Sequence, residues 1–139
     1  MELMIVLIIM SISIGLLMPR IGAGWRRLED RDFLQEFIGT LRAGRLFAMN
    51  SGEVAIFRIR GSERLFGLGE PQKPIPENVD VYSDRLESDP ETKDKLIVFF
   101  PDGSLSGGSM EIVFDQVRSY RIDINPLFGT VQTRRVERR

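Results

Sequence analysis

The residues of this 139-residue chain that could carry out chemistry are few in kind. The sequence contains no histidine and no cysteine, which excludes a Ser-His-Asp relay, a cysteine nucleophile, a Cys/His zinc site and a disulfide framework. Carboxylates, lysine, tyrosine and serine remain, and no convergent acid/base pair stands out among them. We therefore predict a protein with no catalytic residues, no metal site and no cofactor, and a membrane-anchored enzyme is the least favoured class.

Six acidic side chains between positions 80 and 94 are the candidates for a cation site. They are Asp80, Asp84, Glu87, Asp89, Glu91 and Asp94. Ca²⁺ prefers several oxygen ligands, but this segment lacks the alternating spacing and central glycine of an EF-hand loop. The pattern therefore favours a solvated acidic loop, with calcium binding as the alternative.

Four arginines close the chain, and two interpretations of them stay open. The residues are Arg134, Arg135, Arg138 and Arg139. Either they form a solvated, mobile terminus, or they contact nucleic-acid phosphates with a modest, salt-sensitive affinity that does not depend on base sequence. No aromatic side chain lies between these arginines to stack on bases. Because the formal net charge of the chain is −1, a nucleic-acid surface would have to be local.

The elements that position these residues begin with an apolar run. Leu3–Met18 contains no charged residue and is followed by Pro19 and Arg20. As a helix it covers roughly 24 Å of a bilayer core that is about 30 Å thick. A cleaved signal peptide would carry basic residues before the run, and a helix that is apolar all round has too little protein to cover it in so small a chain. We predict a transmembrane helix over residues 1–20.

The first nine residues, MELMIVLII, resemble the N-terminal segment of type IV pilins and type II secretion pseudopilins. In that family a leader ending in glycine is cut before a phenylalanine, and the glutamate that follows corresponds to Glu2. The resemblance implies that Glu2 acts in assembly by pairing with the N-terminal amine of a neighbouring subunit, since an unpaired charge in lipid is costly. A glutamate that reaches out to the membrane interface is the alternative. Pro19 corresponds to a proline that kinks the helix.

The family's leader, cleavage glycine and phenylalanine do not precede Glu2 in this sequence. We expect either that the start has been assigned too late or that the chain is a fragment. The resemblance then implies that a prepilin peptidase removes the missing leader and that the mature N-terminus is methylated.

Residues 21–50 continue with helical spacing as an amphipathic segment. Its apolar stripe comprises Trp25, Leu28, Phe33, Phe37, Ile38, Leu41, Leu46 and Phe47. Gly22 and Gly24 follow Pro19 and favour a soft joint between the two halves of one long helix.

From residue 53 the apolar period changes to two, which is typical of strands. A hairpin is predicted around Gly61, strands over 79–82, 95–100 and 110–115, and no strand between Pro71 and Pro76. We predict an α+β, pilin-like fold, with a long N-terminal helix packed on an antiparallel β-sheet of several strands. The predicted domains are 1–20, 21–50 and 51–139.

A turn motif narrows the resemblance to the GspH/FimT family of minor pseudopilins. It comprises Pro101, Asp102, Gly103, Gly107 and Gly108. The Gly103–Gly108 segment lacks the lysine and the following helix of a phosphate-binding loop, so a turn between strands is favoured.

The resemblance implies a non-enzymatic minor pseudopilin of a type II protein secretion system, incorporated at or near the pseudopilus tip. Its partners would be the other minor pseudopilins, the major pseudopilin and the inner-membrane assembly platform. The implied location is the bacterial inner membrane, single-pass, with the globular domain in the periplasm, although the arginines after the apolar run favour the opposite orientation by charge. The alternative is a FimT-like type IV minor pilin that acts in pilus assembly or in DNA uptake through its C-terminal arginines.

Overall fold

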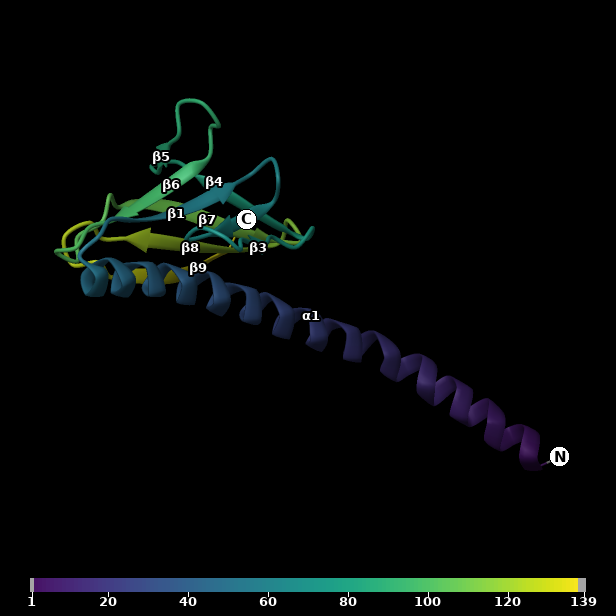
Figure 1. The fold of residues 1–139 in the computed structure, drawn as a ribbon. Coiled ribbons are helices and arrows are strands. Elements are labelled where there is room, and N and C mark those ends of the chain that lie inside the picture. Colours follow the sequence, from purple (N-terminus) through teal and green to yellow (C-terminus); the bar gives the residue numbers. More distant parts are fainter. Residues whose placement is uncertain (1, 138–139) are drawn as a thin grey trace. The chain divides into compact units, whose positions relative to one another are not determined.

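The computed structural model describes the backbone of residues 2–137 and the side chains of residues 3–15 and 28–136. Within these residues one helix, α1 (Glu2–Ser51), precedes nine strands (Figure 1). The chain forms two compact units, Met1–Glu36 and Phe37–Arg139. We call the second unit the head, and the part of α1 inside it the head helix.

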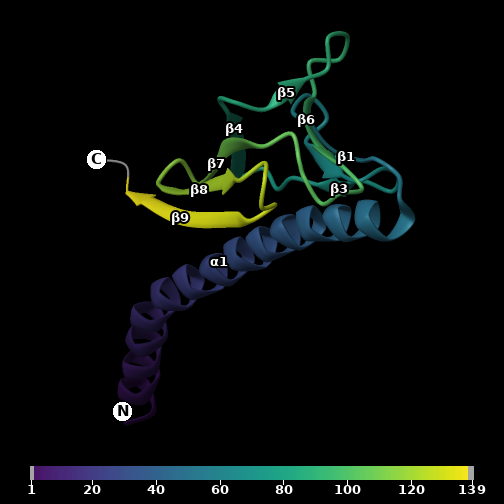
Figure 2. The same cartoon turned by 90° about the vertical axis from the view of Figure 1, so that its left-hand side faces the viewer.

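The nine strands form two antiparallel sheets rather than the single sheet that the sequence predicts (Figure 2). The first has the order β3-β2-β1-β6-β5 and the second the order β4-β7-β8-β9. The strands are β1 (Ala55–Arg60), β2 (Leu65–Gly67), β3 (Lys73–Pro74), β4 (Val79–Ser83), β5 (Glu87–Ser88), β6 (Lys95–Phe99), β7 (Gly108–Phe114), β8 (Arg118–Ile124) and β9 (Val131–Glu137). The helix packed on antiparallel strands is confirmed. The prediction of a single sheet was wrong, because local periodicity does not determine which strands pair over long range.

The core of the head lies between the head helix and the inner faces of both sheets. Phe37 meets Phe57 of β1 edge-on at 5.2 Å between ring centroids, and it meets Phe66 of β2 at 5.0 Å. The second sheet contributes alternate residues of β7, as the sequence predicts for a strand with one buried face. These are Met110, Ile112 and Phe114, all buried, and Val113 on the opposite face of β7 is buried as well.

The buried face of the head helix is narrower than the predicted stripe. Leu46 and Phe47 are 59% and 55% exposed, whereas Ala48 is fully buried. A Cβ atom on Gly44 would lie 2.5 Å from Leu68 Cδ2 and 2.8 Å from Phe99 Cε2. Small residues thus let the helix backbone approach the sheet closely, and the large side chains beside them are turned outward.

The head helix ends where a glycine adopts a left-handed backbone conformation. Gly52 has a φ of 72°, and its N–H donates to the Ala48 carbonyl oxygen at 3.1 Å. Glycine commonly ends a helix in this way, because residues with a side chain rarely adopt the left-handed conformation. It returns the chain directly into β1.

Most strand predictions are confirmed, with differences at sheet edges. The hairpin of β1 and β2 and the strands β4, β6 and β7 form close to their predicted positions. The segment between Pro71 and Pro76 is not free of strand, since β3 pairs there with β2. The acidic segment contains β5, which pairs with β6. Both additional strands are two residues long, and they form by pairing with a neighbour rather than by their own propensity.

Candidate assembly surfaces

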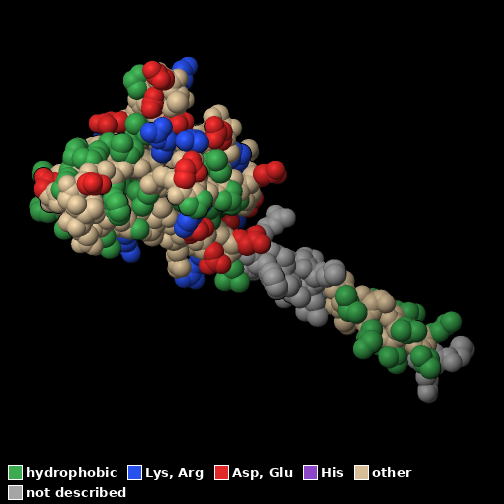
Figure 3. All heavy atoms as spheres, in the orientation of Figure 1, with side chains coloured by type: hydrophobic (Ala, Val, Ile, Leu, Met, Phe, Trp, Pro, Cys, Tyr) green, Lys and Arg blue, Asp and Glu red, His purple; other side chains and the backbone are tan. Residues whose placement is uncertain are grey.

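The first turns of α1 expose apolar side chains in all directions. From Leu3 to Ile14, the ten large hydrophobic side chains are 55–76% exposed. Figure 3 shows hydrophobic side chains covering this part of the helix. Full burial of such a side chain contributes about 1.5–3 kcal/mol, so covering what is exposed on all ten would stabilise an assembly by on the order of 10 kcal/mol. A surface of this kind requires either lipid or other apolar helices around it.

Two serines in this segment keep their hydroxyl groups inside the helix. Ser11 Oγ donates to the Leu7 carbonyl oxygen and Ser13 Oγ to the Ile9 carbonyl oxygen, both at 2.8 Å. A hydroxyl that bonds back to the preceding turn satisfies its donor without water. The serines therefore do not interrupt the apolar character of the segment.

Glu2 and Pro19, the predicted assembly and kink residues, lie at the two ends of the apolar segment. Glu2 is the first residue of α1, and the helix continues through Pro19 without interruption. The side chains of both residues lie outside the described ones, as do those of residues 16–18. The pairing proposed for Glu2 and the kink at Pro19 therefore stay predictions. Within the part of the chain that the structure describes, α1 contains no stretch whose length and hydropathy suffice for a membrane crossing.

The predicted turn motif forms a hydrogen-bonded turn between β6 and β7. Phe100 N–H donates to the Ser104 carbonyl oxygen and Gly103 N–H to the Phe100 carbonyl oxygen, each at 2.9 Å. Asp102 Oδ1 accepts from Ser104 Oγ at 2.5 Å and from Ser104 N–H at 2.9 Å. These bonds, first that from the hydroxyl and then that from the amide, lower the pKa of Asp102 below its ordinary value of 3.8.

The glycines of the motif are required by backbone shape and by space. Gly103 and Gly107 have φ values of 85° and 73°. A Cβ atom on Gly108 would lie 2.8 Å from the Arg85 carbonyl oxygen, and one on Gly107 would lie 3.0 Å from Pro126 Cβ. The turn is therefore packed on its neighbours, which is a structural role for this motif.

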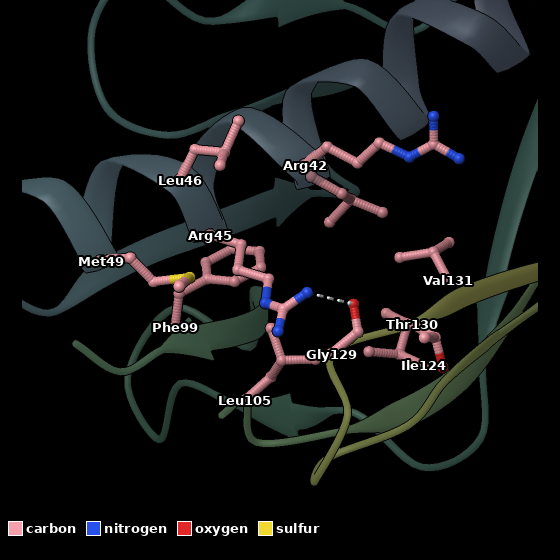
Figure 4. Close-up of a pocket in the computed structure, with 11 residues that line it drawn as sticks. Arg42, Arg45, Leu46, Met49, Phe99, Leu105, Ile124, Gly129, Thr130 and Val131 are labelled. Carbon is pink, nitrogen blue, oxygen red and sulfur yellow. Dashed lines mark hydrogen bonds between the residues drawn. The ribbon is translucent and has the colours of Figure 1, made fainter. Parts of the chain in front are cut away.

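Arg45 ties the head helix to two turns, a role that no pattern in the sequence indicates. Its Nε donates to the Gly103 carbonyl oxygen at 3.0 Å, and its Nη1 donates to the Gly129 carbonyl oxygen at 3.4 Å (Figure 4). The guanidinium group thus joins the β6–β7 turn and the β8–β9 turn to the end of the helix. An arginine outside the apolar stripe is ordinarily predicted to be solvent-exposed. The spacing of residues along the helix does not reveal the distant carbonyl groups to which Arg45 donates.

A cavity of about 380 Å³ lies beside Arg45, between the head helix and the two sheets. Figure 4 shows Arg45 pointing across it toward Gly129. Most of the other lining side chains are apolar: Leu41, Leu46, Met49, Phe99, Leu105, Ile124 and Val131. Arg42 also lines the cavity, so the lining combines an apolar wall with two arginines.

The acidic segment is not simply a solvated loop, because arginines of the first sheet and its hairpin lie against it. Arg58 Nη1 lies 3.9 Å from both Asp89 Oδ2 and Asp94 Oδ2, and Arg60 Nε lies 3.8 Å from Asp94 Oδ2. Figure 3 shows acidic and basic side chains next to one another on this side of the head. Asp89 also accepts the N–H groups of Glu91 and Thr92, which lowers the pKa of Asp89.

The arrangement of the acidic segment gives no support to calcium binding. In the described residues, no three acidic side chains come together as a metal site would require. Asp80 contacts a different arginine, with its Oδ1 3.8 Å from Arg64 Nη1.

The predicted arginine tail is an edge strand as far as Glu137. Arg134 pairs with Arg121 of β8, and Arg135 pairs with Tyr120. Because successive side chains of a strand point to opposite faces, Arg134 and Arg135 cannot contribute to one patch. Arg138 and Arg139 lie outside the described residues. The structure instead places Arg121 next to Arg134, both exposed, on the outer face of the second sheet.

Comparison with known proteins relates the chain to one class of fold. Neither protein-family models nor curated proteins contain a match to the sequence. Among solved structures, the chain is similar to the minor pseudopilin EpsH from the type 2 secretion system of Vibrio cholerae, with a TM-score of 0.58 and 15% identity. The similarity covers 76% of this chain and 95% of EpsH. It shows a pseudopilin-like fold, while the narrower GspH/FimT assignment stays a prediction.

Proposed function

We propose that this chain is a minor pseudopilin of a type II protein secretion system, a non-enzymatic subunit that is built into the pseudopilus at or near its tip. The observation that carries the proposal is the apolar helical segment of residues 3–15, exposed on all sides, in a chain with a pseudopilin-like fold. Such a segment is unstable in water by itself and becomes stable in lipid, or packed against similar helices.

The chain would be held in the bacterial inner membrane by residues 1–20, with the head in the periplasm, before it enters the fibre. Glu2 would pair with the N-terminal amine of a neighbouring subunit, because a lone carboxylate among apolar helices is costly. The partners would be the major pseudopilin, the other minor pseudopilins and the inner-membrane assembly platform. A prepilin peptidase would remove the leader.

The test is the incorporation of Glu2 variants into the fibre. Because the chain has no cysteine, Ser13→Cys introduces a single crosslinking site on the apolar segment. Losing one partner of a buried ion pair costs about 3–5 kcal/mol, so Glu2→Ala should lower the crosslink yield in sheared fibres about a hundredfold or more. Glu2→Asp keeps the charge and is the matched control. A Glu2→Ala chain that crosslinks at the wild-type yield, with the head still protease-resistant, would refute the assembly role.

A FimT-like minor pilin that binds DNA is the second candidate, and one observation favours it. Arg121 and Arg134 lie directly opposite each other on the exposed face of β8 and β9, and Glu111 of β7 lies opposite Arg121 on its other side. A bound phosphate would relieve the repulsion between the two arginines, in competition with the Glu111 carboxylate. A gel-shift series with rising salt compares the wild-type chain with Arg121→Ala and with Arg135→Ala. DNA binding that weakens with Arg121→Ala and not with Arg135→Ala supports this candidate, and binding that is absent or indifferent to both changes removes it.

A further inference from the structure

The last strand of the second sheet, β9, has one open edge. Within the part of the chain that the structure describes, β9 pairs with β8 on one side and with no strand on the other (Figure 2). Its side chains over residues 131–136 are exposed or half-buried, so solvent reaches this edge. A strand of seven residues with an open edge can pair with another extended chain.

The hydrogen bonds at the start of β9 establish which backbone groups face outward. The Asn125 N–H donates to the Thr130 carbonyl oxygen at 3.0 Å, which makes these two residues a hydrogen-bonded pair. Such pairs alternate along an antiparallel ladder, so residues 132, 134 and 136 bond to β8. The residues whose N–H and C=O groups point away from β8 are Val131, Thr133 and Arg135. No other hydrogen bond within the described residues occupies these outward groups.

The open edge begins beside the cavity of about 380 Å³ described above. Val131, the first residue of β9, lines this cavity together with Ile124, its partner in β8. In a strand added to β9, alternate side chains would lie on the same sheet face as Val131. One of them would therefore enter the cavity, whose wall is mostly apolar and suits an apolar side chain.

Two arginines of the head helix stand at the same cavity. Arg42 and Arg45 both line it, and residues three apart in a helix lie on one face. Figure 4 shows Arg42 and Val131 on opposite sides of the cavity. Arg45 is fixed by its bonds to the carbonyl oxygens of two turns, which leave its charge in place. Arg42 forms no hydrogen bond or ion pair with any described residue.

The residues that line this cavity include both arginines and no aspartate or glutamate. Asp102, in the adjoining turn, is bonded to Ser104. Among the described residues, neither Asp102 nor Glu53 forms an ion pair with Arg42 or Arg45. Two like charges beside an apolar wall favour a bound carboxylate, because hydrogen bonds from arginine to a carboxylate are among the strongest in proteins.

We propose that the start of β9, the cavity and the two arginines form a binding site for the carboxyl terminus of an extended polypeptide that ends in an apolar residue. The outward backbone groups of β9 pair with the guest chain, the cavity receives its last side chain, and Arg42 and Arg45 bind its terminal carboxylate. Because the cavity lies where β9 begins, the guest chain runs antiparallel to β9. The site uses no residue of the apolar segment of α1, so this inference goes beyond the proposed function and does not depend on it.

Two other occupants use the site less completely. A second copy of this chain, paired twofold through the whole of β9, would place Arg134 opposite the same residue of the other copy. Like charges directly opposite each other in a sheet are destabilising. A fatty acid would satisfy the cavity and the arginines but would leave the outward backbone groups of β9 without partners.

The experiment measures binding of the fluorescein-labelled peptide Ser-Thr-Ser-Thr-Leu to the full chain in phosphatidylcholine nanodiscs, by fluorescence anisotropy. The peptide with a free carboxylate should bind about tenfold more tightly than the same peptide with a C-terminal amide. Arg42→Met should remove this difference, and circular dichroism should show that the fold is kept, since Arg42 is exposed. Arg31→Met is the matched control, because Arg31 is an exposed arginine of α1 that does not line the cavity.

Two N-methylated peptides test the pairing with β9. One carries the methyl group on the amide of the last residue and the other on the amide before it. Successive N–H groups of a strand point in opposite directions, so one of the two peptides should bind about tenfold more weakly and the other should bind as before. Peptide binding that is absent at millimolar concentration, equal binding of acid and amide, an unchanged affinity of Arg42→Met, or equal effects of the two methyl groups would overturn the proposal. Displacement of the peptide by octanoate as effectively as by unlabelled peptide would overturn it in favour of a fatty acid, and self-association of the chain that blocks the peptide would overturn it in favour of a second copy.

Discussion

Alanine substitutions at two glycines of the head helix test how closely this helix approaches the first sheet. Gly44 faces the core, and a Cβ atom on it would lie 2.5 Å from Leu68 Cδ2 and 2.8 Å from Phe99 Cε2. Gly39 lies five residues earlier, and a Cβ atom there would meet no atom within 4 Å. Both positions are inside α1, so alanine at either one gains the same intrinsic helix propensity, about 1 kcal/mol.

Gly39→Ala should therefore raise the free energy of unfolding by about 1 kcal/mol. Gly44→Ala gains the same amount but forces Leu68 and the Phe99 ring to move, and overpacking of this kind costs about 1–3 kcal/mol. The net change for Gly44→Ala ranges from about zero to a loss of 2 kcal/mol. Urea unfolding of the full chain in detergent, followed by circular dichroism, measures both variants. Equal gains for Gly44→Ala and Gly39→Ala would show that the helix does not approach the sheet at Gly44.

Two further predictions concern the turns that the head helix holds. Arg45→Met keeps most of the side chain's apolar contact but removes the donors to Gly103 and Gly129, so the free energy of unfolding should fall by about 1–3 kcal/mol; an unchanged urea midpoint would contradict the tie. Asp102→Asn removes the carboxylate whose pKa is lowered by Ser104. A carboxylate with a lowered pKa stabilises the fold at a pH above its ordinary pKa of 3.8, and this stabilisation is lost as the pH falls through the lowered pKa. The difference in Tm between wild type and Asp102→Asn should therefore be present at pH 6 and shrink below a pH of about 4, and a difference that grows in acid would contradict this sign.

The local elements of the head could be predicted from the sequence because their signals are local. The alternation of Met110, Ile112 and Phe114 predicts a strand with one buried face, and all three are buried in β7. The Pro-Asp-Gly-Ser sequence after β6 predicts the turn that Asp102 and Ser104 close. In each case the pattern and the structure depend on neighbouring residues only.

The remaining features depend on contacts that are distant in the sequence. The division into two sheets follows from the pairing of β1 with β6, which joins Ala55 to Phe99. The carbonyl groups that Arg45 binds lie 58 and 84 residues further along the chain. The exposure of Phe47 follows from the small size of its neighbour Ala48 and of Gly44, which a search for large apolar residues does not reveal.

The pairing of β9 sets a limit on how the chain can be shortened. Residues 134–139 look dispensable in the sequence, yet Arg134, Arg135, Val136 and Glu137 all pair with β8. Cutting the chain after Thr133 would remove four residues of β9 that pair with β8. The backbone N–H and C=O groups of β8 exposed by this change could then pair with any extended polypeptide nearby. A version of the protein made without its last arginines would therefore tend to aggregate, and a loss of nucleic-acid binding measured on it would reflect damage to the sheet. Single side-chain replacements, which keep the strand in place, are the changes that isolate the role of each arginine.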